Sequence, residues 1–98
     1  MNRLQELMVI TMEECGELTQ ECSKTLRRFE REGGVTKKQR EKMLEEAGDV
    51  YAMIQLMIHQ GFFSYYELEV RAKEKQRKLE KWSKLFDEDI SEDFMLDV

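Results

Sequence analysis

Two acidic motifs contain residues that could bind a metal ion. The first reads Glu-Glu-Cys-Gly-Glu-Leu over residues 13–18, and the second reads Glu-Glu-Ala-Gly-Asp-Val over residues 45–50, an interval of 32 residues. Carboxylate oxygens are the ligands that Mg²⁺ prefers, and Mg²⁺ keeps part of its water shell for substrate phosphates. If both motifs face the same point, they could hold a metal ion that assists a reaction of a phosphate-bearing ligand.

Helical geometry predicts that four of these acids converge. On a helical wheel at about 100° per residue, Glu14 lies about 40° and Glu17 about 100° from the centre of the apolar stripe on its helix. Glu46 and Asp49 take the same two angles on the second helix. Buried like charges are costly unless something compensates them, and a divalent cation is the natural compensation. The alternative is an ordinary solvated acidic face, against which the matching positions of the two copies argue.

Three helices must position these acids. The chain has 98 residues and no proline, which favours long uninterrupted helices. The pair Gly33-Gly34 and Gly61 are stop signals. Thr36 and Ser64 are each followed three residues later by Gln or Glu, the spacing of a capping box. We therefore predict one domain over residues 1–98, with helices over about 3–32, 36–60 and 65–85 and an acidic tail over 87–98 whose role stays open.

Each predicted helix carries an apolar stripe at spacings of three and four residues. Three such helices make an incomplete bundle in a short chain, so we expect an all-α fold, an antiparallel helical bundle completed by dimerisation. Gly16 and Gly48 face away from the stripes and are either points of close approach for another helix or tolerated weak helix formers. The stripes comprise Leu4, Leu7, Thr11, Leu18, Cys22 and Phe29; Met43, Val50, Ile54 and Met57; and Leu68, Ala72, Leu79, Trp82 and Phe86.

The composition restricts the function classes. The net charge is −5, whereas general nucleic-acid binders are usually basic, and no apolar run approaches the roughly 20 residues of a membrane span. We expect a cytoplasmic protein with no nucleic-acid or membrane partner, in which Cys15 and Cys22 are reduced core residues. The only histidine, His59, lacks the Glu three residues before it that di-iron bundles use, and we interpret it as a partly exposed structural residue.

A basic segment in the third helix supplies candidate phosphate contacts. Relative to Leu79, the side chains of Arg71, Lys75 and Lys78 lie within about 100° and to one side, from where they could reach over the carboxylates. Trp82 lies one turn beyond on the same side and could stack on a base. The alternative interpretations are a solvated basic surface for the cations and core packing for the tryptophan.

The pattern Glu13-Glu14-x-x-Glu17, a spacer and Glu46-x-x-Asp49, followed by the basic helix, resembles the metal motif of the MazG-like nucleotide pyrophosphohydrolases. These belong to the all-α NTP pyrophosphatase superfamily, and the resemblance, to the compact single-domain type of phages and bacteria, covers roughly residues 4–85. It implies Mg²⁺ as the cofactor, with Mn²⁺ as a substitute, and a homodimer or dimer of dimers in the cytoplasm, or the host cytoplasm for a phage protein. The metal ligands and catalytic residues that it implies are Glu14, Glu17, Glu46 and Asp49.

The resemblance also implies hydrolysis of (d)NTPs to (d)NMP and pyrophosphate, by attack of an activated water on a phosphorus. The family's downstream Lys-x-x-x-Asn-x-x-Arg is met here, in the nearest register, by Arg71, Lys75 and Lys78, so a lysine stands in place of the asparagine. These cations and Trp82 are the expected substrate contacts. Two alternatives stay open: a related pyrophosphohydrolase acting on dUTP, dCTP, phosphoribosyl-ATP or an alarmone, and a non-catalytic helical dimer that only binds a partner.

Overall fold

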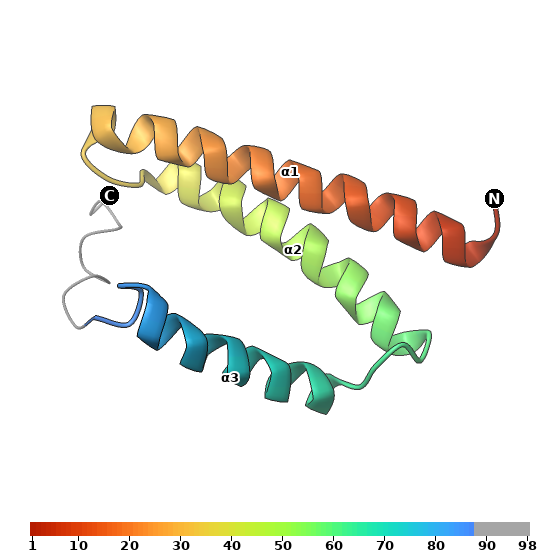
Figure 1. Ribbon diagram of the computed structural model, residues 1–98. Helices are drawn as coiled ribbons and strands as arrows, with labels where there is room; N and C mark the ends of the chain where they lie inside the picture. Colours follow the sequence, from red (N-terminus) through yellow and green to blue (C-terminus); the bar gives the residue numbers. More distant parts are fainter. Residues whose placement is uncertain (88–98) are drawn as a thin grey trace.

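Three helices in sequence make up the computed structural model, which describes residues 1–87 (Figure 1). Helix α1 spans Arg3–Glu32, α2 spans Lys37–His59 and α3 spans Tyr65–Trp82. The all-α prediction is confirmed, and the first two helices have the predicted bounds to within one residue. All but the first residue of the predicted acidic tail over 87–98 lies outside the described residues.

Side-chain caps set the helix starts. The predicted capping boxes at Thr36 and Ser64 are both present, and a third, which the sequence analysis missed, joins Asn2 to Gln5 at the start of α1. At the end of α1, Gly33 takes a left-handed conformation (φ 77°), which costs glycine no steric strain. These caps satisfy helix-end groups that would otherwise lack partners.

The predicted end of the third helix is wrong by three residues. The helix ends at Trp82 rather than Leu85, because Ser83 adopts an extended conformation (φ −140°, ψ 170°). Its hydroxyl donates a hydrogen bond to the Leu79 carbonyl (2.8 Å) and accepts one from the Leu85 amide (3.2 Å). Serine competes for backbone hydrogen bonds in this way and thereby interrupts the helix.

Helices α1 and α2 form an antiparallel hairpin that is closest near its connection and splays toward the chain's N-terminus (Figure 1). Among residues 1–87 only Leu7 and Met53 are buried apolar side chains, while most of the α1 and α2 stripe residues are half-buried. Helix α3 runs back in the direction opposite to α2 (Figure 1), and none of its residues is buried. The core therefore lies almost entirely between two helices.

Several predicted core residues are exposed in this chain. Trp82, the last residue of α3, is 85% exposed, and Phe86, which follows the end of that helix, is 50% exposed. Cys15 and Cys22 are free, as predicted, but exposed rather than in the core. No described helix is both long and apolar enough to cross a membrane. Leu4, which was predicted to belong to the apolar stripe of the first helix, is also exposed. Further large apolar side chains on the surface include Met12, Leu26, Leu44, Tyr51, Leu56, Tyr65 and Tyr66.

Candidate metal centre

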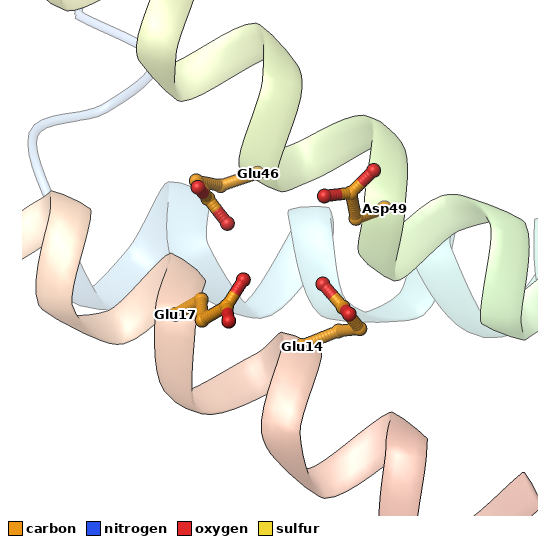
Figure 2. A group of neighbouring side chains, drawn as sticks. All are labelled: Glu14, Glu17, Glu46 and Asp49. Atoms are coloured by element: carbon orange, nitrogen blue, oxygen red, sulfur yellow. The ribbon is translucent and has the colours of Figure 1, made fainter.

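Four acidic side chains from the two helices of the hairpin meet between them. Glu14 and Glu17 come from successive turns of α1, and Glu46 and Asp49 from successive turns of α2 (Figure 2). One carboxylate oxygen from each residue can be chosen so that all four atoms lie within 4.8 Å of one another. The convergence predicted from the wheel is therefore observed, and this acidic quartet forms a group that could hold a metal ion.

The burial of the quartet follows its wheel positions. Glu46 is 5% exposed and Glu14 is half-buried, whereas Glu17 and Asp49 are open to solvent. One buried oxygen of Glu14 and one of Glu46, both Oε2, have no hydrogen-bond partner among residues 1–87. Buried acceptors without partners are unfavourable, and a hard cation is the ligand that suits carboxylate oxygens. The donor set thus fits a divalent cation.

The like charges of the quartet affect Glu17 most. The pKa of its carboxyl is raised above 4.5, first by the charge of Glu14, then by a hydrogen bond with Glu46 and by the charge of Glu46. Crowded carboxylates repel one another, and this repulsion favours the protonated form of Glu17. A bound cation would relieve the same repulsion.

Lys42 is a functional candidate that the sequence analysis missed. Its Nζ lies 3.0 Å from Oε1 of Glu46 and 3.5 Å from Oε2 of Glu45. The hydrogen bond to Lys42 lowers the pKa of Glu46 against the opposing effect of burial, and the same contact raises the pKa of Lys42. The sequence signal was a lysine four residues before Glu46, a spacing that places both on one helix face.

The predicted substrate contacts on α3 are not brought to the quartet within one chain. Arg71 pairs with Glu74 on its own helix (3.1 Å), and Lys75 and Lys78 are exposed. Across residues 1–87 no ion pair links these cations to the four acids. Trp82 lies at the end of α3, packed neither in a core nor against the quartet.

Two polar cavities continue from the quartet toward the connection between α1 and α2. The cavity at the acids measures about 280 Å³, and the next measures about 390 Å³. They share residues from both helices, so we describe them together as the charged trench. The first is lined by Glu17, Gln20, Glu21, Lys24, Lys42, Glu45, Glu46 and Asp49, and the second by Glu21, Lys24, Arg28, Lys38, Gln39, Glu41, Lys42 and Glu45.

An apolar groove of about 400 Å³ lies on the opposite side of the quartet, at the splayed end of the hairpin. Its walls include Leu7 and Ile10 of α1, Met53 and Leu56 of α2, and Phe62 from the following loop. His59, exposed in the last turn of α2, lines neither this groove nor the trench. The quartet thus separates an apolar surface from a charged one.

Comparison of the chain with protein-family models, with curated protein sequences and with solved structures finds no match. The functional assignment therefore depends on the chemistry of the quartet and its surroundings.

Proposed function

We propose that this protein is a Mg²⁺-dependent nucleoside triphosphate pyrophosphohydrolase, which converts (d)NTP to (d)NMP and pyrophosphate. The observation that carries the proposal is the acidic quartet, in which four carboxylates from two helices converge and two buried oxygens find no hydrogen-bond partner within residues 1–87. A purely structural role would leave this repulsion uncompensated. The motif's resemblance to MazG-like pyrophosphohydrolases supports the choice of reaction.

In this proposal Glu14, Glu17, Glu46 and Asp49 hold the cation, and Lys42 stabilises the ionised form of Glu46. When bound, Mg²⁺ would neutralise phosphate charge and lower the pKa of a coordinated water. Three of the four acids, Glu17, Glu46 and Asp49, line an open polar cavity, through which phosphate groups would reach them. Arg71, Lys75 and Lys78 would offset charge on the leaving pyrophosphate, and Trp82 would stack on the base, once α3 is brought against the site.

The proposal includes a homodimer. One chain buries only two apolar side chains among residues 1–87 and leaves the apolar face of α3 uncovered. Pairing with a second copy would complete the bundle and bury this surface. A dimer of dimers is the alternative assembly.

The test of the reaction is pyrophosphate release from a panel of (d)NTPs, with and without Mg²⁺. Glu46→Gln should lower kcat by about 100-fold or more, the scale on which a key electrostatic contact acts. Glu13→Gln is the matched control, since Glu13 belongs to the same motif yet is exposed and outside the quartet. Equal activity of the Glu46 variant and the control would remove the quartet from the mechanism.

Two alternatives are separated by the same panel. Turnover confined to dUTP, dCTP, phosphoribosyl-ATP or an alarmone would keep the reaction and change the substrate. A non-catalytic helical dimer, which the exposed apolar side chains favour, predicts no turnover and no Mg²⁺-dependent thermal shift.

A further inference from the structure

We propose that the cations of the charged trench bind the distal phosphates of the substrate, through Lys24 and Arg28 of α1 and Lys38 and Lys42 of α2. The inference rests on the proposed function, because it assigns the phosphate contacts of that same site. It moves these contacts from α3 to the hairpin itself.

The trench cations follow the quartet along both helices. Lys42 lies one helical turn before Glu46, and Lys38 one turn further. On α1, Lys24 lies two turns after Glu17, and it lines the cavity at the acids together with Lys42. One turn of helix rises about 5.4 Å, so the cations stand at short, regular steps away from the acids. This arrangement suits an extended chain of phosphates that starts at the quartet.

The trench also holds donors that lack partners. Lys24, Arg28 and Lys38 form no ion pair within the described part of the chain. Gln39 is only 4% exposed, and its buried Nε2 donor has no hydrogen-bond partner among residues 1–87. Unsatisfied buried donors are costly. A ligand with many acceptor oxygens on several phosphorus atoms meets this requirement better than one with a single carboxylate.

The charge of the trench makes this binding dependent on the metal. Three carboxylates, those of Glu21, Glu41 and Glu45, line the second cavity beside the four cations, so the excess in that cavity is one positive charge (4 − 3). Over both cavities six carboxylates stand beside the same four cations. The neighbouring quartet is strongly negative without a cation. Phosphates should therefore bind in the presence of Mg²⁺ and weakly in its absence.

The apolar groove, on the other side of the quartet from the trench, is less favourable for phosphates. The groove beyond the quartet is walled mainly by apolar side chains, with Arg3 as its only cation. No residue of α3 lines either trench cavity. The second cavity, which has one cation in excess, is thus the favoured position for the distal phosphates once a cation occupies the quartet.

The test is calorimetric binding of inorganic tripolyphosphate to the full chain in saturating Mg²⁺. The double variant Lys24→Gln with Arg28→Gln should weaken binding by roughly 10- to 100-fold, as expected for loss of charged hydrogen bonds. The control, Lys73→Gln with Arg77→Gln, removes the same two residue types at the same spacing from the exposed surface of α3. Its affinity should stay within about twofold of wild type.

A second variant addresses the buried amide. Gln39→Glu keeps the side-chain oxygen that accepts from the Thr36 amide and replaces the unpartnered donor by a carboxylate. It should also weaken tripolyphosphate binding while thermal melting shows that the chain still folds. Binding equal to wild type would remove Gln39 from the proposed contacts.

The outcomes separate this inference from the proposed function. If wild type binds no tripolyphosphate, or if the trench and control variants bind it equally, the trench assignment is overturned even where nucleotides are hydrolysed. If binding is lost selectively in the trench variant while no nucleotide is turned over, the trench stands and the proposed reaction falls.

Discussion

Glu17 and Glu46 face each other across the hairpin in different electrostatic surroundings. Glu46 has a cation beside it, since Nζ of Lys42 lies 3.0 Å away. Glu17 is surrounded by the carboxylates of Glu14, Glu46 and Asp49, all of which raise its pKa. In the metal-free chain the repulsion is therefore concentrated on Glu17, which makes this residue the sensitive probe of the site.

Glu17→Gln should stabilise the metal-free protein at neutral pH. The pKa of Glu17 in the folded chain is raised above 4.5. Between these two pKa values the folded state therefore binds more protons than the unfolded state. The free energy of unfolding therefore falls as pH rises from about 4.5 through the raised pKa. The measurement is the melting temperature of both proteins in the presence of a chelator, taken at intervals of about one pH unit between about pH 4 and pH 8.

The difference between this variant and wild type should disappear below the unfolded-state pKa, where both side chains are neutral. A variant that melts below wild type at neutral pH in chelator would contradict the assignment of repulsion to Glu17.

Mg²⁺ should stabilise wild type and fail to stabilise Glu46→Gln. A ligand that binds only the folded state adds RT ln(1 + [L]/Kd), about 2.7 kcal/mol at 100 times Kd. Removing Glu46 takes away the most buried carboxylate of the quartet. Melting temperature as a function of Mg²⁺ concentration is the measurement, with Glu13→Gln expected to shift as wild type does.

At the scale of the helices, the hairpin depends on its caps. The Thr36 hydroxyl accepts a hydrogen bond from the backbone amide of Gln39 (3.2 Å), and the side-chain oxygen of Gln39 accepts one from the backbone amide of Thr36 (3.0 Å). Thr36→Ala should therefore lower the free energy of unfolding by about 1 kcal/mol, the usual cost of a lost N-cap. Urea denaturation measures it. The control is Thr19→Ala, whose hydroxyl bonds only to the Cys15 carbonyl inside α1 and whose loss should cost little.

Gly16 and Gly48 test whether another helix approaches the hairpin closely. A Cβ atom at either position meets nothing within 4 Å in this chain. Replacement by Ala should thus stabilise the isolated chain by roughly 0.5–1 kcal/mol per site, through better helix propensity. Chemical denaturation measures the gain in the free energy of unfolding, and sedimentation measures the effect of the substitution on self-association. If Ala weakens self-association, these glycines lie in an interface between chains.

Signals from neighbouring residues predicted the helices and the quartet. They did not predict features that depend on packing between elements far apart in the sequence. Capping spacings and Gly33-Gly34 identified the starts and the turn, since these depend on neighbouring residues only. Two copies of one acidic pattern revealed a shared inward face. The wheel places Arg71 and Trp82 on the apolar side of α3, yet it says nothing about which element covers that side. That is why the expected approach of α3 to the quartet is not found in one chain.

At the scale of the whole molecule, the apolar surface predicts self-association. We expect sedimentation to give twice the mass of one chain or a multiple of it. Trp82, the only tryptophan, is 85% exposed in one chain, so its fluorescence should shift to shorter wavelength on association and return on dilution. A single-chain mass at all concentrations, with an unchanged spectrum, would contradict the dimer.

The connection between α1 and α2 consists of residues 33–36 only, which has a consequence for how the hairpin opens and closes. Ordering a short connection costs little loop entropy, and contacts between residues near in sequence form rapidly. Helices α1 and α2 should therefore make contact first beside the turn and last at the splayed end (Figure 1). Backbone amide hydrogens should accordingly exchange with deuterium faster over residues 3–10 and 53–59 than over 20–30 and 38–46.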